Sequence, residues 1–346
     1  MKFLFKLTSL LASQTALFVA LAAALAFAQP EAFKWVKGDT QAAILGLIML
    51  TMGMTLSASD FKILLEKPLY ILIGALAQYT LMPLGALAIV HALGLPQGIA
   101  AGLMLVGCCP GGVSSNIMSF LAKGDLAYSV GMTSVSTLLS PIVTPALMLF
   151  LSGHFVEIDA LSMFKSILIV TLIPVCLGMF LNFLLSKFEF YKSIVRLMPA
   201  LSVISLALIV GGVTAHQGSY FFTSGLTIFC AIALHNALGY AGGYAVAKLF
   251  KMRKDKCRTL SIEVGCQNAG LATNLASAHF QALPESAVAS AVACVYHSLS
   301  GTVLANAFAF SDRLKSKRAK KRAKIPGASG RLEAVSLEPK RENPPQ

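Results

Sequence analysis

The sequence predicts an all-α membrane protein that crosses the bilayer many times. Of its 346 residues, 56% are hydrophobic and 12% are charged, and the mean hydropathy is +0.73. A soluble domain carries about 25% charged residues. Apolar runs of about 17–25 residues, the length that spans a bilayer, recur along nearly the whole chain. These observations exclude an ordinary soluble enzyme or binding domain.

Ten apolar segments lie between charged residues or Pro/Gly breaks, and each predicts one transmembrane helix. Charged residues mark their ends because Lys and Arg favour the aqueous side of the interface. The predicted spans are 7–28, 41–59, 68–92, 98–121, 126–153, 161–186, 197–215, 222–247, 259–279 and 287–310.

The first span has two interpretations. MKFLFKLTSLLASQTALFVALAAALAFAQ has a basic start, an apolar middle and a small-residue AFA, which is the outline of a cleavable signal peptide. Its apolar stretch is long for a signal peptide, and its removal would break the symmetry described below. We therefore expect it to be retained as a helix.

The basic residues predict the orientation. With the N-terminus inside, the cytoplasmic segments hold 25 of the 28 Lys and Arg residues, so both termini are expected in the cytoplasm of a bacterial cell, with the protein in its inner membrane. Eight of these residues form the stretch SDRLKSKRAKKRAK, which is typical of contact with lipid headgroups rather than nucleic acid. We expect a transporter domain over 1–315 and a basic, disordered cytoplasmic tail over 316–346.

Two pairs of segments suggest an internal duplication. TMGMTLSASDF (51–61) aligns with VGGVTAHQGSY (210–220) at an offset of 159, and GCCPGGVSSN (107–116) aligns with GCQNAGLATN (265–274) at 158. A five-helix unit has an odd number of spans, so the second copy would enter from the opposite side. Such inverted repeats are typical of secondary transporters. The repeats would cover about 7–153 and 161–310, although short apolar segments also resemble one another by chance.

The fourth and ninth spans carry residues that interrupt a helix. Proline removes an amide donor, and glycine weakens a helix. Backbone that leaves a helix inside the bilayer must line a cavity or be buried in protein, and matched breaks in two halves indicate a transport site. The predicted breaks are Pro110, Gly111, Gly112 and Gly265.

Glu263 is the one acidic residue, of fifteen, that falls within a predicted span. An intramembrane carboxylate is by default a functional-site hypothesis, although Arg258 is close enough in sequence for a structural role. Amides and hydroxyls on the same or partner spans are hard oxygen ligands, and one carboxylate among them suits a monovalent cation. Sodium is the first candidate and a proton is the rival. These polar residues are Gln78, Ser114, Ser115, Asn116, Ser129, Thr133, Ser134, Ser136, Thr137, Gln267 and Asn268.

The helix breaks also predict an anion site. They create helix N-termini, whose exposed amides and positive dipole ends attract anions. Because no Lys or Arg is placed within a span except Lys165 at the outer end of 161–186, a bound anion would depend on backbone amides, Asn268 and His297. His297 could equally be a hydrogen-bonded packing residue.

The motifs GCCPGGVSSNIMSFLAKGD, SVGMTSVSTLLSPIVTP, TLSIEVGCQNAGLATNLA and VYHSLSG resemble those of the bile acid:sodium symporter family, close to its bacterial members. The resemblance covers about residues 10–310. It implies ten helices in two inverted five-helix repeats, divided into a core and a panel domain. The discontinuous fourth and ninth helices would cross at the middle of the membrane.

The resemblance also implies site residues. One sodium site would use Ser115, Asn116, Ser129, Thr133 and Glu263; the second would use Gln78, Glu263, Gln267 and the carbonyls of Val264 and Cys266. The organic anion would lie near Gly112, Val113, Asn268, His297 and Ser298. At Val113 and Ser298 the bacterial members carry a hydroxyl-bearing residue and an asparagine, so the match is weaker for the substrate than for the ions.

The sequence therefore predicts sodium-driven uptake of an organic anion, either bile-acid-like or a small metabolic acid such as pantoate, by alternating access. We expect no cofactor besides the transported sodium ions, and a monomer is sufficient. Proton coupling on the same fold is one alternative. Another is an intramembrane enzyme with Cys108 or Cys109 as nucleophile and His297 as base, although the seven cysteines show no metal-ligand spacing and suit small buried side chains.

Overall fold

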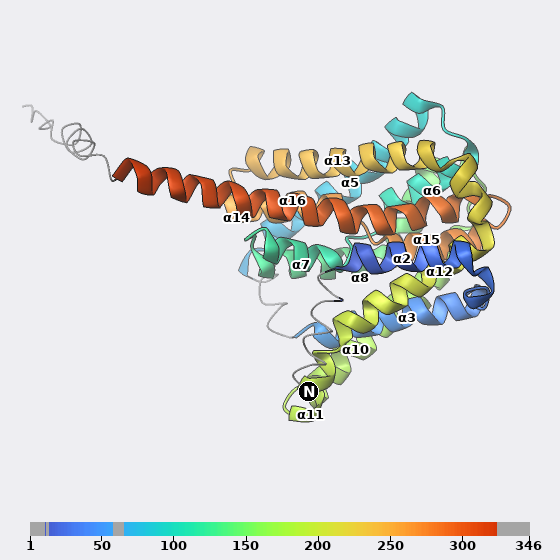
Figure 1. Cartoon of the computed structure of the whole chain (residues 1–346), viewed down its shortest axis with the longest axis horizontal. Coiled ribbons are helices and arrows are strands. Elements are labelled where there is room, and N and C mark those ends of the chain that lie inside the picture. Colours follow the sequence, from blue (N-terminus) through green and yellow to red (C-terminus); the bar gives the residue numbers. More distant parts are fainter. Residues whose placement is uncertain (1–10, 12–13, 58–65, 324–346) are drawn as a thin grey trace, which may run out of the picture.

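A computed structural model describes residue 11 and residues 14–57 and 66–323, with side chains up to residue 314. These residues are helical apart from short connections, and no β-strand occurs among them (Figure 1). The helices are α2 (Thr15–Ala28), α3 (Gly38–Thr55), α5 (Pro68–Leu93), α6 (Gln97–Cys108), α7 (Ser114–Leu121), α8 (Leu126–Ser152), α9 (Ala160–Ile167), α10 (Ile173–Leu185), α11 (Glu189–Val195), α12 (Met198–Thr223), α13 (Gly225–Leu249), α14 (Lys254–Gly265), α15 (Ala269–His279) and α16 (Glu285–Ala323).

Six helical segments of the described chain are long and apolar enough to cross a membrane, which confirms an integral membrane protein. Four more of the predicted spans correspond to shorter or interrupted helices, namely α2, α3, the pair α6–α7 and the pair α14–α15. The count of ten spans stays a prediction. The six segments are Pro68–Leu93, Leu126–Ser152, Ala160–Leu185, Glu189–Thr223, Gly225–Leu249 and Glu285–Leu314.

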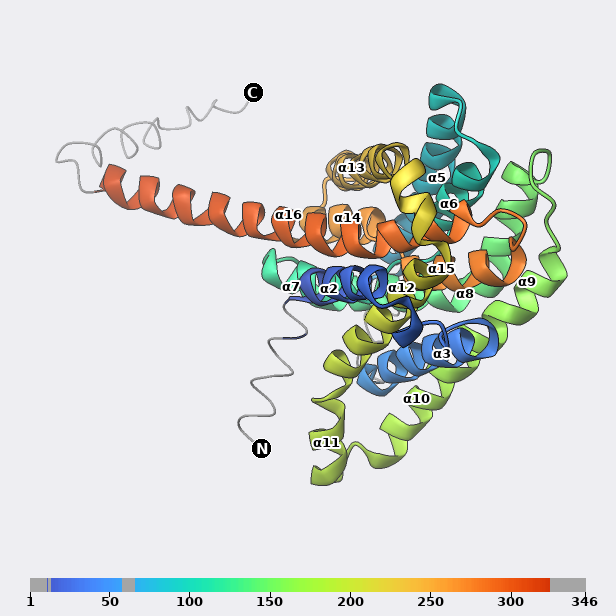
Figure 2. The same ribbon diagram turned by 45° about the vertical axis from the view of Figure 1, so that its right-hand side comes forward.

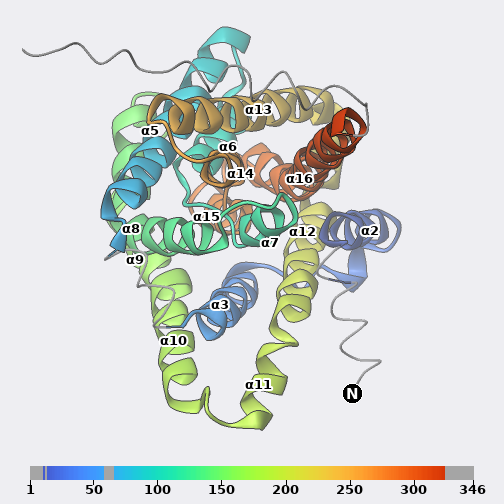
Figure 3. The same ribbon diagram turned by 90° about the vertical axis from the view of Figure 1, so that its left-hand side faces the viewer.

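Contacts divide the described helices other than the short α9 and α11 into two groups. The panel group consists of α2, α3, α10 and α12, in which α3 packs on α10 and α12, and α2 packs on α12. The core group consists of α5, α6, α7, α8, α13, α14, α15 and α16, and its interrupted helices lie at the centre (Figure 3). The groups meet where α15 contacts α3 and where α16 contacts α12 and α2.

One predicted span is irregular. The sequence predicts a continuous helix over 161–186, but Leu168–Leu172 forms a π-helical turn between α9 and α10. Pro174 lies in the first turn of α10, and its missing amide leaves a carbonyl of the preceding turn without its usual donor. The wider turn accommodates the proline without ending the helix.

The last helix is longer than expected. α16 continues to Ala323, so residues 316–323, which we predicted to belong to a disordered tail, are helical. Lys, Arg and Ala dominate this part of the sequence, and all three are good helix formers. Figure 2 shows this end of α16 projecting away from the other helices. The tail from 324, residues 7–10 and 12–13 of the first predicted span, and residues 58–59 of the second lie outside the described residues.

Candidate ion and substrate site

The two helix breaks are joined by backbone hydrogen bonds. Between α6 and α7, Gly112 N donates to the carbonyl of Cys266 at 2.8 Å; between α14 and α15, Asn268 N donates to the carbonyl of Pro110 at 2.8 Å. Gly111 and Gln267 form the antiparallel bridge between these two bonds. The backbone groups released by each broken helix are therefore partly satisfied by the other break, as a buried crossing requires.

The predicted break residues lie at this crossing for identifiable reasons. Pro110, Gly111 and Gly112 occupy the non-helical segment, and Gly265 is the last residue of α14. A Cβ atom at Gly112 would lie 2.6 Å from the Gln267 carbonyl oxygen, and one at Gly265 would lie 2.1 Å from the Tyr240 ring. Both positions need glycine because neighbouring atoms fill the space of a side chain.

An oxygen cluster, defined as Asn116, Ser129, Thr133 and Glu263, lies beside the crossing. The Glu263 carboxylate is 1% exposed. It accepts hydrogen bonds from Ser129 Oγ and, at 2.8 Å, from Thr133 Oγ1. Asn116 Oδ1 lies 2.8 Å from Ser129 Oγ and 3.4 Å from Thr133 Oγ1. Ser115, also predicted for this site, is buried and donates to the Gly112 carbonyl at 2.6 Å.

The oxygen cluster contains more acceptors than protons. A hydroxyl carries one proton. Ser129 Oγ lies within hydrogen-bond distance of Asn116 Oδ1 and of one Glu263 oxygen, while Thr133 Oγ1 reaches Asn116 Oδ1, the other Glu263 oxygen and, at 3.1 Å, the carbonyl of Ser129. When both hydroxyls donate to Glu263, Asn116 Oδ1 receives neither proton although it faces both oxygens, so a cation or an added proton would complete the site. Hard oxygen ligands of this kind suit an alkali cation.

A second set of predicted ligands forms a chain of amides. Gln78 Nε2 donates to Gln267 Oε1 at 2.5 Å and to the Cys109 carbonyl at 3.2 Å, and Gln267 Nε2 donates to the Val264 carbonyl at 2.5 Å. Gln78 Oε1 is buried and has no hydrogen-bond partner among the described residues. The Cys266 carbonyl accepts from Gly112. The structure thus brings these residues together and leaves one oxygen available for a ligand.

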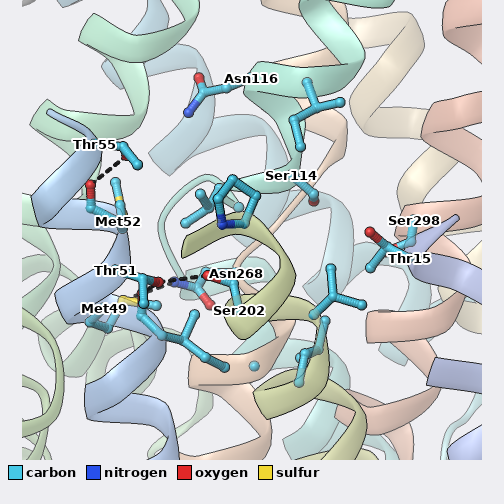
Figure 4. Close-up of a pocket in the computed structure, with 18 of the residues that line it drawn as sticks. Thr15, Met49, Thr51, Met52, Thr55, Ser114, Asn116, Ser202, Asn268 and Ser298 are labelled. Carbon is cyan, nitrogen blue, oxygen red and sulfur yellow. Dashed lines mark hydrogen bonds between the residues drawn. The ribbon is translucent and has the colours of Figure 1, made fainter. Parts of the chain in front are cut away.

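A cavity of about 430 Å³, which we call cavity I, lies between the panel group and the crossing (Figure 4). All five predicted substrate residues line it: Gly112, Val113, Asn268, His297 and Ser298. None of the described lining residues is Lys, Arg, Asp or Glu. An anion in cavity I would therefore be held by dipoles and hydrogen bonds rather than by a side-chain cation.

Two of these residues have polar atoms available. Asn268 Oδ1 caps α15 by accepting from Leu271 N at 3.0 Å, whereas its Nδ2 has a 3.9 Å contact with the sulfur of Met49. His297 Nδ1 accepts from Gln267 N at 3.3 Å, and its buried Nε2 has no partner in the described part of the chain. Ser298 Oγ, in contrast, donates to the Cys294 carbonyl at 3.0 Å.

Comparison with known proteins supplies the family. The model of the Sodium Bile acid symporter family matches residues 42–224, just over half of the chain. An uncharacterized sodium-dependent transporter of Bacillus subtilis, YocS, is 44% identical over 300 residues, which cover 86% of this chain and 90% of the relative. The probable chloroplastic sodium/metabolite cotransporter BASS1 of Oryza sativa is 40% identical over 291 residues, covering 83% and 70%. The chain belongs to the sodium bile acid symporter family.

Membership of the sodium bile acid symporter family excludes the intramembrane-enzyme alternative. The protein is a transporter of a sodium-dependent family and not an enzyme. Cys108 and Cys109 are buried in the core, with free thiols, as expected for small apolar side chains.

The symporter also has lining residues that the sequence analysis did not single out. Thr51 of α3 and Ser202 of α12 line cavity I, and their hydroxyl oxygens lie 2.6 Å apart. Figure 4 shows this pair on the panel side, close to Met49 and Asn268. An isolated hydroxyl in an apolar helix gives no sequence signal, because only the rotation of the helix decides whether it lines a cavity.

A second cavity of about 910 Å³, cavity II, lies at the opposite ends of α3 and α12. Its lining includes Gln41, whose Nε2 donates to Ser277 Oγ at 3.3 Å between α3 and α15. One turn further along α3, the fully buried Leu45 lines cavity I instead. The two cavities therefore approach the crossing from opposite ends of the bundle.

Charged residues at the start of α14 fix the core near the oxygen cluster. Arg258 donates to Asp312 at 2.7 Å and to the Ala122 carbonyl at 2.8 Å, so it is not the partner of Glu263. Lys256 pairs with Asp125, which precedes α8. Burial alone would raise the pKa of the Asp125 carboxyl, but hydrogen bonds from Lys256 and from the Tyr128 amide, together with the nearby positive charge, hold that pKa below its usual value.

Proposed function

We propose that this chain is a sodium-driven symporter that imports an organic anion by alternating access. The observation that carries the proposal is the convergence of Asn116 Oδ1, two hydroxyl oxygens and the buried Glu263 carboxylate, with both hydroxyl protons used on Glu263 and none left for Asn116 Oδ1. A single carboxylate with neutral oxygens gives the charge and ligand type that a monovalent cation needs. Family membership supports sodium as that cation.

The first sodium ion would bind Asn116, Ser129, Thr133 and Glu263, with Ser115 next to them. The second would use the Gln78 and Gln267 amides, the carbonyls of Val264 and Cys266, and the negative charge of Glu263. The unpartnered Gln78 Oε1 supports this second assignment, because a buried carbonyl oxygen without a donor is costly. Glu263 would then stabilise both ions.

The organic anion would bind in cavity I against the crossing. Its negative charge would lie near the N-terminal ends of α7 and α15, where backbone amides point toward the break. Asn268 Nδ2 and His297 Nε2 supply donors that have weak or no partners among the described residues, and Gly112, Val113 and Ser298 shape the wall. The mainly apolar remainder of the cavity suits a bile-acid-like molecule or a small branched acid such as pantoate.

Alternating access would expose the crossing to each side in turn. We propose ten spans in two inverted repeats, in a bacterial inner membrane, with both termini in the cytoplasm. In that orientation cavity I opens toward the cytoplasm and cavity II toward the outside. Two sodium ions and one monovalent anion would carry one net charge inward, to which the membrane potential contributes about 2.3 kcal/mol per 100 mV.

Proton coupling is the second candidate, favoured by the same observation. A proton on Glu263 would supply the donor that the oxygen cluster lacks. Sodium coupling and proton coupling predict different responses. A proton-coupled site responds to pH and not to the choice of alkali cation.

The test is thermal unfolding of the purified protein in NaCl or KCl at equal ionic strength, at pH 6 and pH 8, with a panel of organic acids. Sodium at 100 times its Kd should stabilise the fold by about 2.7 kcal/mol, and an accepted anion should stabilise it further only in sodium. Equal stability in NaCl and KCl, with a shift that follows pH, would contradict sodium coupling.

A further inference from the structure

Asn116 lies on the boundary between the oxygen cluster and cavity I. The other three members, Ser129, Thr133 and Glu263, are at most 1% exposed and do not line the cavity. Asn116 is half-buried and lines it, as Figure 4 shows. Of the cluster residues, it is therefore the one that a ligand in cavity I can touch.

The two edges of the Asn116 amide face different environments. Its Oδ1 lies 2.8 Å from Ser129 Oγ and 3.4 Å from Thr133 Oγ1, on the side of Glu263. Its Nδ2 makes no hydrogen bond with any described residue. A primary amide presents an acceptor at one edge and two donors at the other, so one side chain can contact a cation and an anion together.

We propose that Asn116 couples the two transported species by ligating the cation through Oδ1 and donating a hydrogen bond to the organic anion through Nδ2. This role rests on the proposed function, since it needs a cation in the oxygen cluster and an anion in cavity I. It gives Asn116 a substrate contact in addition to the ion-ligand role that the family resemblance implies.

The physical basis is polarisation of the amide. A cation on Oδ1 draws electron density toward the oxygen and makes the N–H groups stronger donors, and an anion on Nδ2 makes the oxygen a stronger ligand. Each ligand therefore raises the affinity for the other by the same factor, which thermodynamic linkage requires of any coupled pair. In this arrangement the coupling passes through one planar group and needs no movement of a helix.

Asn116→Ser tests the coupling directly, because serine keeps an oxygen near the cluster and removes the NH₂ group. The sodium affinity of the purified protein is measured by thermal unfolding, without anion and with saturating pantoate or taurocholate as probes. In the unchanged protein the better probe should raise sodium affinity by about fivefold or more. In Asn116→Ser this factor should fall to about one, while sodium affinity without anion falls by about tenfold or less.

Asn274→Ser is the matched control. Asn274 follows Asn116 by 158 positions, is buried on α15 and lines cavity II instead of cavity I. This variant should keep the full coupling factor. A reduced factor in Asn274→Ser would mean that loss of any buried amide near the crossing disturbs coupling, and would overturn the assignment.

Asn116→Asp provides a second variant. It keeps an oxygen on the cluster and adds negative charge, so sodium affinity should be retained or increased while the probe anion no longer binds. An unchanged coupling factor in Asn116→Ser, or loss of sodium binding in both variants, would overturn the role of Asn116. If the unchanged protein shows no sodium effect, or no probe couples to sodium, the proposed function fails and this inference fails with it.

Discussion

The α7–α8 region and the α15–α16 region carry similar polar residues beside the two helix breaks. Ser115 and Asn116 correspond to Thr273 and Asn274 at the offset of 158. Each following helix begins with two hydroxyls four residues apart, and the second donates to the carbonyl of the first, at 3.1 Å in Thr133–Ser129 and 2.9 Å in Ser290–Ser286. Glu263 has no acidic counterpart, because the residue 158 positions before it is Leu105.

The two regions differ in the hydrogen-bond partners of these hydroxyl groups. Ser129 Oγ contacts the Glu263 carboxylate and Asn116. Ser286 Oγ is buried and has no partner among the described residues, and position 105 supplies an aliphatic side chain. If the two regions arose by the duplication that we propose, one carboxylate decides which half binds a cation. The inverted scaffold would then be nearly symmetric while ion binding is not.

Removing that carboxylate should have the largest effect. In Glu263→Gln the side chain keeps its shape but loses the charge that compensates a buried cation. Leaving a buried charge without its partner costs about 3–5 kcal/mol, so sodium affinity should fall by at least about 100-fold and sodium-dependent uptake should disappear. Uptake into proteoliposomes and thermal unfolding in NaCl measure both effects. Folded Glu263→Gln that still responds to sodium would refute the ion assignment.

A transplanted carboxylate sharpens the comparison. In the Glu263→Gln background, Leu105→Glu places an acid at the equivalent position, near Asn274, Ser286 and Ser290 if the repeat holds. The double variant should be less stable than Glu263→Gln in KCl, because its new charge is buried, and should recover in NaCl. The readout is the difference in Tm between NaCl and KCl. Each kcal/mol of sodium-dependent stabilisation raises Tm by about 4–8 °C in a small domain and by less in this longer chain.

The matched control is Leu105→Gln in the same background. It adds a polar group of similar size without charge, so it should lower stability equally in NaCl and KCl. A double variant with Leu105→Glu that is equally unstable in both salts would show that the α15–α16 region does not reproduce the geometry of the oxygen cluster.

The comparison also shows which parts of the site were predictable. Proline and glycine disfavour a helix in any context. Pro110, Gly112 and Gly265 therefore predicted the helix breaks without any knowledge of tertiary contacts. The meeting of Ser129 and Thr133 with Glu263, about 130 residues away, came from the family resemblance, since spacing cannot determine contacts between distant helices. Thr51 was missed as a lining residue because helix rotation is not encoded locally. Residues 316–323 were predicted to be disordered because few of them are apolar, yet they are helical because Lys, Arg and Ala favour a helix without a buried face.

The smallest predicted effect is a difference in sodium affinity between variants of the two hydroxyl pairs, Ser129–Thr133 and Ser286–Ser290. Ser129→Ala removes one oxygen from the cluster, and the loss of one ligand or charge-assisted hydrogen bond, about 1.5–3 kcal/mol, should weaken sodium binding by at least about tenfold. Ser286→Ala should leave sodium affinity unchanged and should not lower stability, because its Oγ has no hydrogen-bond partner to lose in the described part of the chain. Sodium titrations followed by thermal unfolding compare the two variants. Equal losses of sodium affinity would mean that both regions contribute to ion binding and that Glu263 does not confine it to one of them.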